Sequence, residues 1–161
     1  MQITEIIPTI AELAVTVAGF SAVVVALRRK PVRDWNALDR FHLRVLLQVA
    51  ALTVIFCIFP FGALVVFEPE TAWKVSLLVY GFVHLIDLAS FGFNLPEDMI
   101  PINKVSIGIG TAMALAQIAI GFTGEMATIQ LMYLVTLLWH LATSCLGFAR
   151  LIYTQVGSGR S

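Results

Sequence analysis

Four ionisable residues lie inside apolar stretches of this sequence that are long enough to cross a bilayer: Glu12, His84, Asp87 and His140. A charged side chain at the centre of a membrane helix costs about 2.5 to 3.5 kcal/mol even on the mildest insertion scale, so such residues usually serve a function. Carboxylates and imidazoles can pass protons to one another. Proton or ion transfer is therefore the first chemistry that these residues indicate.

More polar residues share helical faces with these four. They recur at steps of three or four residues in three segments: Glu5, Thr9, Glu12 and Thr16; Ser76, Tyr80, His84, Asp87, Ser90 and Asn94; Tyr133, Thr136, His140 and Thr143. This spacing places each set on one face of a helix. We predict a transport pathway lined by Glu12, Thr16, Tyr80, His84, Asp87, Tyr133, Thr136 and His140.

The depths of these residues in the membrane also match, when residues are counted from the outer ends at about 1.5 Å of rise each. Glu12, Tyr80 and Tyr133 share an outer layer, and Gln117 falls near it. Thr16, His84 and Thr136 share a middle layer, whereas Asp87 and His140 share an inner one. In this hypothesis Glu12 is the outer proton acceptor, His84 the relay, and Asp87 with His140 the inner site.

Other interpretations of the same residues stay open. Polar residues can join membrane helices through hydrogen bonds worth about 0.6 kcal/mol each, which explains the hydroxyls better than the acids. His84 and His140 could instead ligate haem b in an electron-transfer subunit. A noncatalytic assembly or sensor protein is a third possibility. We expect no enzymatic activity and no metal site, since no catalytic motif occurs and the four ionisable residues span too much depth.

The amino-acid composition indicates whether the segments that carry these residues lie in water or in a lipid bilayer. Of the 161 residues, 59% are hydrophobic and only 12% are charged, which is typical of an integral membrane protein. Five apolar segments approach the roughly 20 residues that a bilayer requires: 6–27, 41–67, 73–93, 105–122 and 126–150. Lipid offers the backbone no hydrogen bonds, so these segments must be helices. We predict an all-α bundle of five transmembrane helices in a single domain, 1–161.

Basic residues predict the orientation of the bundle. Six of the ten lie within seventeen positions around the start of the second span: Arg28, Arg29, Lys30, Arg33, Arg40 and Arg44. The positive-inside rule assigns this stretch to the cytoplasm, with the N-terminus outside and the C-terminus inside, most simply in a bacterial inner membrane. Arg28, Arg29, Lys30 and Arg33 could also contact anionic lipids. The net charge of zero gives no indication of nucleic-acid binding.

Local signals predict how the helices begin, bend and pack. Asp34 is a plausible N-cap for the second helix, and Pro60 should kink that helix near its outer end. Small residues recur at steps of four along two ridges: Ala14, Ala18, Ala22 and Ala26; Gly108, Ala112 and Ala116. Such ridges let membrane helices approach closely, within one chain or between copies. With the small size of the chain, they lead us to expect a homo-oligomer.

Overall fold

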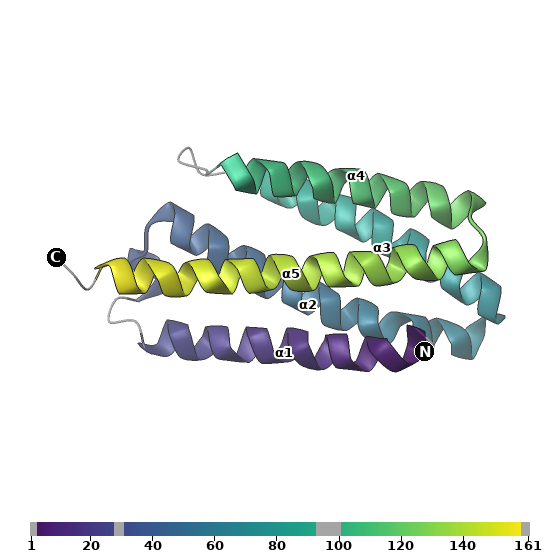
Figure 1. Cartoon of the computed structure of the whole chain (residues 1–161), viewed down its shortest axis with the longest axis horizontal. Coiled ribbons are helices and arrows are strands. Elements are labelled where there is room, and N and C mark those ends of the chain that lie inside the picture. The colour runs from purple at the N-terminus through teal and green to yellow at the C-terminus, as the bar shows by residue number, and fades with distance from the viewer. Residues whose placement is uncertain (1–2, 28–30, 93–100, 159–161) are drawn as a thin grey trace. The chain divides into compact units, whose positions relative to one another are not determined.

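The computed structural model describes residues 3–27, 31–92 and 101–158, and the secondary structure in these ranges is helical (Figure 1). The helices are α1 (Ile3–Leu27), α2 (Ala37–Val66), α3 (Pro69–Gly92), α4 (Pro101–Thr123) and α5 (Met126–Ser158), with a short 3-10 turn, η1 (Val32–Asp34). The predicted all-helical fold is confirmed over these ranges.

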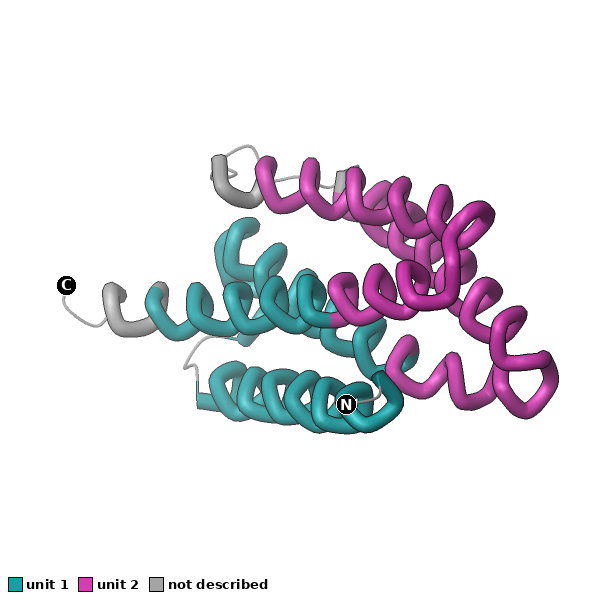
Figure 2. The backbone as a smooth tube through the Cα atoms, turned by 45° about the vertical axis from the view of Figure 1, so that its right-hand side comes forward, with its two compact units in different colours: residues 1–55, 138–161 teal, residues 56–137 magenta. Residues whose placement is uncertain are grey.

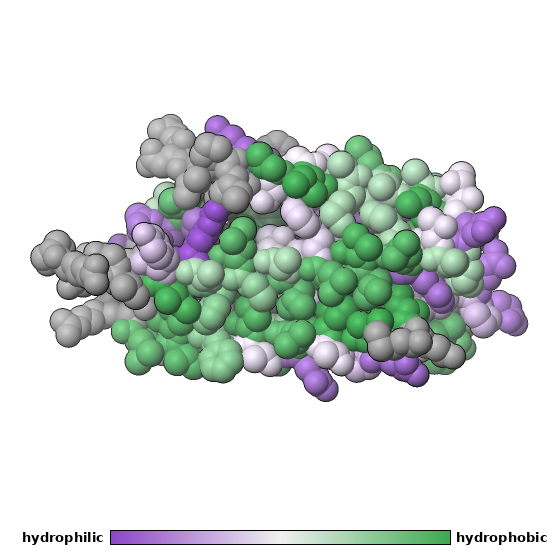
Figure 3. All heavy atoms as spheres, in the orientation of Figure 1, coloured by the Kyte–Doolittle hydropathy of each residue, from purple (hydrophilic) through white to green (hydrophobic). Residues whose placement is uncertain are grey.

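All five α-helices are long and apolar enough to cross a membrane, as predicted. Large apolar side chains such as Phe20, Val65, Ile86 and Phe122 are exposed along the helices. Figure 3 shows the hydrophobic side chains covering much of the helical surface in that view. α2 begins four residues before the predicted span, and α5 continues to Ser158. Helical hydrogen bonding continues past the apolar core because the backbone bonds to itself in water as well as in lipid.

The start of α2 differs from the prediction. Asn36, not Asp34, caps the helix, because its Oδ1 accepts a hydrogen bond of 2.7 Å from the Asp39 amide. Asp34 lies in η1, where its amide donates to Pro31 O. The next residue, Trp35, is buried in a cluster with Leu43, Leu46 and Leu151. Burial of this large ring anchors the turn and leaves Asn36 at the point where the helix begins.

The described chain forms two compact units, coloured in Figure 2, and their boundaries fall within α2 and α5. Unit 1 comprises residues 1–55 and 138–161, and unit 2 comprises residues 56–137. In unit 1, a side chain at Gly147 of α5 would place its Cβ 3.3 Å from Leu46 Cβ of α2. Glycine therefore permits α2 and α5 to approach closely beside the Trp35 cluster.

In unit 2, α3 and α4 pack side by side along their length (Figure 1). A Cβ at Gly81 of α3 would lie 2.8 Å from Ile118 Cγ1 of α4, and one at Gly121 of α4 would lie 2.7 Å from Leu78 Cγ of α3. The ridge of α4 that meets α3 consists of Gly110, Ala114, Gln117 and Gly121, all buried. The predicted ridge lies on another face, with Gly108 and Ala112 exposed and Ala116 half-buried.

Candidate functional site

The polar face of α3 is buried. Ser76 and Tyr80 have no exposed surface, while His84 and Asp87 are 2% and 6% exposed. These residues follow one another at steps of four, four and three, so they form a row along the helix. The face that the sequence predicts to be polar is therefore one that α3 turns towards other helices.

His84 of this row is paired with Gln117 of α4. Their Nδ1 and Oε1 atoms are 3.1 Å apart. Since an amide oxygen only accepts, Nδ1 donates in this orientation of Gln117, and Nε2 is the basic nitrogen. That Nε2 lies 3.5 Å from the position a Cβ would take at Gly110. Glycine thus makes room on α4 for the imidazole ring.

Gln117 has no exposed surface. Its Nε2 finds no hydrogen-bond partner in the described part of the chain. Leaving a buried donor unsatisfied costs about 1 to 3 kcal/mol. Gln117 is also absent from the predicted pathway, whose depth estimate placed it one layer above His84. One feature of the sequence does point to Gln117: it lies on the same face of α4 as the small residues Gly110, Ala114 and Gly121, at steps of four, three and four.

Tyr133 of α5 is hydrogen-bonded to the part of α2 that contains Pro60. Its hydroxyl donates a hydrogen bond of 2.6 Å to Phe56 O. Pro60 lies four residues after Phe56 and lacks the amide hydrogen that would otherwise bond to this carbonyl. A side chain from another helix therefore satisfies the backbone group that proline leaves open, as membrane helices require.

Aromatic rings connect this hydrogen bond to the row on α3. Tyr80 stacks on Phe56, with ring centroids 4.0 Å apart and an interplanar angle of 11°. It also meets Tyr133 edge to face at 5.3 Å. The Tyr80 and His84 rings are 6.3 Å apart. The structure thus brings together three predicted pathway residues, Tyr80, His84 and Tyr133.

Two further predicted pathway residues lie in unit 2. Asp87 follows His84 by three residues, and its carboxyl interacts electrostatically with the Tyr80 phenol. Thr136 is buried on α5, where its hydroxyl donates to Met132 O of the same helix at 2.9 Å. We use the name unit 2 polar cluster for Tyr80, His84, Asp87, Gln117 and Tyr133.

The remaining predicted residues lie in unit 1. His140 is 2% exposed on α5. Glu12 and Thr16 are exposed on α1, and the Thr16 hydroxyl donates to Glu12 O of the same helix at 2.7 Å. The buried face of α1 carries Ile7, Ile10, Ala14 and Ser21 instead. The polar face of α1 is therefore exposed, and Figure 3 shows hydrophilic atoms along the edge of this helix.

A second polar contact that the sequence analysis missed joins α2 and α5 in unit 1. Arg150 Nη1 lies 3.2 Å from Nε2 of the buried His42. Because arginine only donates, His42 accepts through this nitrogen. The buried Asp39 interacts electrostatically with the same imidazole. Arg150 does continue the polar period of α5, but its partner lies 108 residues away in the sequence.

The structure also bears on metal and haem binding. Among the described residues, no three or more His, Cys, Asp and Glu side chains are grouped to hold a metal ion. The two histidines of the haem hypothesis belong to different units. His84 packs within the contact between α3 and α4, with Nδ1 on Gln117 and Nε2 beside Gly110. Haem ligation by His84 and His140 stays a prediction.

Comparisons with known proteins give no family for this chain. No protein-family model matches it, and no curated protein or solved structure matches it either.

Proposed function

We propose that this protein conducts protons across a cell membrane through the unit 2 polar cluster. The observation that carries the proposal is the buried row of Tyr80, His84 and Asp87 on a helix that is apolar enough to span a bilayer. Ionisable groups at membrane depth usually belong to ion pathways or proton relays. His84 is suited to a relay because an imidazole takes up and releases protons near neutral pH.

The packing around the row favours protons over hydrated ions. Tyr80 and Phe56 are in van der Waals contact at a centroid distance of 4.0 Å, and Tyr133 adjoins the same ring. A hydrated cation would have to separate these rings. A proton can instead pass between hydrogen-bonding groups and single water molecules. The Gln117 amide, a buried donor beside His84, is a suitable site for such a water molecule.

A purely structural role explains only part of the cluster. The Ser76 and Thr136 hydroxyls donate to carbonyls of their own helices, so burial leaves them satisfied. The Tyr133 hydroxyl has a structural role, because it donates a hydrogen bond to Phe56 O. An acid and an imidazole on the same buried face are costlier than either hydroxyl and are not needed to join helices. Proton transfer gives these two groups a role that justifies their cost.

The proposal includes the setting of the pathway. We place the protein in a bacterial inner membrane, with the N-terminus outside and the C-terminus in the cytoplasm, on the distribution of basic residues. We also propose that it forms a homo-oligomer. Glu12 supports this proposal because it is exposed within the α1 span, where contact with lipid would cost about 2.5 to 3.5 kcal/mol. A second copy covering this face would remove that contact.

Flux through proteoliposomes tests the proposal. Purified protein is reconstituted with a pH-sensitive dye in the lumen, and a potassium gradient with valinomycin imposes a membrane potential. We expect wild-type vesicles to change luminal pH well above the rate of empty vesicles. We expect Asp87→Asn to lower this rate at least tenfold. Glu70→Gln is the matched control, since it removes a carboxylate that is exposed and paired with Lys74 at 2.7 Å, and it should leave the rate unchanged.

Two results would contradict the proposal. Wild-type vesicles that match empty vesicles would refute proton conduction, and an undiminished rate in Asp87→Asn would remove Asp87 from the pathway. The absorption spectrum of the same preparation, from cells supplied with haem, tests the alternative. A Soret band that disappears in His84→Ala would favour the electron-transfer hypothesis.

A further inference from the structure

One exposed face of α2 changes from basic to apolar along its length. Arg40 and Arg44 are exposed in the first turns of the helix, and Leu47, Ala51 and Ile55 are exposed further along. Steps of four, three, four and four keep these five residues on one face. We call them the α2 basic-to-apolar face. All five belong to unit 1.

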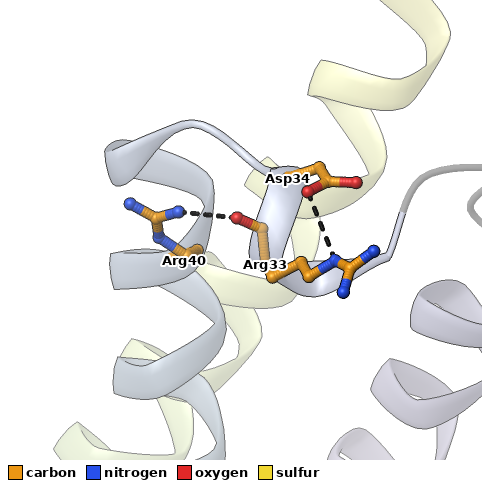
Figure 4. Close-up of polar contacts among 3 residues, drawn as sticks. All are labelled: Arg33, Asp34 and Arg40. Carbon is orange, nitrogen blue, oxygen red and sulfur yellow. Dashed lines mark hydrogen bonds and ion pairs between the residues drawn. The ribbon is translucent and has the colours of Figure 1, made fainter.

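The arginines are anchored at the end of the helix where this face begins. Arg40 Nη1 donates to Arg33 O at 3.1 Å, which attaches its side chain to the preceding η1 turn (Figure 4). Arg44 Nε donates to Gln48 Oε1 at 3.2 Å. A guanidinium has five N–H donors, so the hydrogen bond of Arg40 to Arg33 O leaves capacity for a further acceptor.

In the described part of η1 and the start of α2, two acidic residues accompany these arginines. Asp39 is buried, at 7% exposure, and interacts with His42. Asp34 lies beside Arg33, with Oδ1 at 3.5 Å from Nε (Figure 4). Arg33 is itself 86% exposed at its side chain. The described surface at the start of α2 therefore carries the exposed guanidinium groups of Arg33, Arg40 and Arg44 beside the exposed carboxylate of Asp34.

We infer that the α2 basic-to-apolar face binds an anionic phospholipid. Its phosphate lies at Arg40 and Arg44, and one acyl chain lies along Leu47, Ala51 and Ile55. Arginine binds phosphate in bidentate fashion, and each basic residue near an anionic membrane surface contributes about 1 kcal/mol. Leu47 and Ile55 are 43% and 53% exposed, which provides apolar surface next to the charges. A free phosphate ion would use only the arginines, so the adjoining apolar residues favour a lipid.

A basic loop that merely sets orientation would behave differently. The positive-inside rule depends on how many basic residues lie near the membrane, whereas a lipid site depends on their positions. Arg40→Gln and Arg44→Gln remove charges from the proposed site. Lys104→Gln removes an exposed charge from the first turns of α4, which the same topology places on the cytoplasmic side. Lys104→Gln is therefore the matched control.

Native mass spectrometry of the full-length protein in detergent tests the inference, because it measures the affinity for each lipid. Phosphatidylglycerol and phosphatidylcholine with identical acyl chains are titrated as probes. We expect wild type to bind phosphatidylglycerol at least tenfold more tightly than phosphatidylcholine. We expect about a fivefold loss of phosphatidylglycerol affinity for each arginine replaced, which corresponds to about 1 kcal/mol. Lys104→Gln should stay within twofold of wild type, and Leu47→Gln should weaken binding of both lipids.

Other results would overturn the inference. Equal binding of the two lipids, or an Arg40→Gln/Arg44→Gln variant within twofold of wild type, would show that the face is not selective for the anionic headgroup. Displacement of phosphatidylglycerol by millimolar inorganic phosphate, with no effect of Leu47→Gln, would assign the site to a free anion. Circular dichroism and a topology reporter check that each variant keeps its helices and its orientation.

Discussion

α1 and α3 carry the same kind of polar pattern and use it in opposite ways. Both have polar residues at steps of three and four, including an acid within the span. On α3 the pattern is buried, with Asp87 at 6% exposure. On α1 it is exposed, and an apolar face with Ile7 and Ile10 is buried instead.

A helical period therefore fixes which residues lie together on a helix but not which way they face. α3 is held against α4 by glycines at the contact, which bring His84 to Gln117. On the polar face of α1, by contrast, a Cβ at Gly19 would meet no described atom within 4 Å. A polar face of a membrane helix is therefore buried within the chain only where a neighbour offers both space and hydrogen-bonding partners.

The close approach of α3 and α4 gives the largest stability effect that we expect. In Gly81→Ala the new Cβ would lie 2.8 Å from Ile118 Cγ1 and 3.2 Å from Ala114 O, so the Ile118 side chain must move or the helices must separate. We expect a loss of about 1 to 3 kcal/mol in the free energy of unfolding, measured by denaturation in mixed micelles.

Gly62→Ala provides the matched control, because a Cβ there meets no atom within 4 Å. Alanine favours a helix over glycine by up to about 1 kcal/mol, so this variant should be as stable as wild type or more stable. Equal effects of Gly81→Ala and Gly62→Ala would show that the tight contact between α3 and α4 is not what positions the polar cluster.

The second prediction concerns the hydrogen bond from Tyr133 to Phe56 O. Tyr133→Phe leaves this buried carbonyl without its donor, so we expect a loss of about 1 to 2 kcal/mol in the free energy of unfolding. Thr136→Val should cost less, because that hydroxyl bonds only to a carbonyl of its own helix, which already takes part in helical bonding.

A double-mutant cycle with Pro60→Ala tests the reason for this hydrogen bond. Alanine restores an amide at position 60 that can bond to Phe56 O. The effect of Tyr133→Phe should therefore be smaller in the Pro60→Ala background. Additive effects of the two substitutions would mean that Tyr133 does not compensate for the proline.

We expect the smallest effect on stability from a substitution of Glu12, the exposed acid within the α1 span. Glu12→Leu should change the stability of the detergent-solubilised monomer by less than about 0.5 kcal/mol, because Glu12 is exposed within its own chain. It should weaken self-association in lipid by about 1 kcal/mol, since polar contacts between membrane helices are of this size. Energy transfer between labelled copies in vesicles measures the association.

Glu5→Leu is the control for this prediction. Glu5 shares the exposed face but lies in the first turn of α1, near the end of the apolar span. It should therefore contribute less to association than Glu12. Unchanged association in Glu12→Leu would show that the polar face of α1 is not a contact between copies.

Much of the fold was predictable from local sequence. The five helices follow from the length and apolarity of their segments, and the start of α2 was missed by only two residues, from Asp34 to Asn36. The placement of Tyr80, His84 and Asp87 on one face of α3 follows from their spacing, whereas the burial of that face does not. Gln117 was missed as a member of the cluster because its pairing depends on how far α4 is shifted along α3, and depth counting does not resolve one helical turn.

Transfer and hydrogen-bonding free energies add up residue by residue along a segment, so local sequence is enough to predict which segments are helical and apolar enough to cross a membrane. The packing of the helices decides which side chains meet: His84 with Gln117, Tyr133 with Phe56 O, and Arg150 with His42. Each of these pairs depends on the rotation and shift of one helix against another. Packing of small residues sets these quantities, and it also leaves Glu12 on an exposed face while Asp87 is buried.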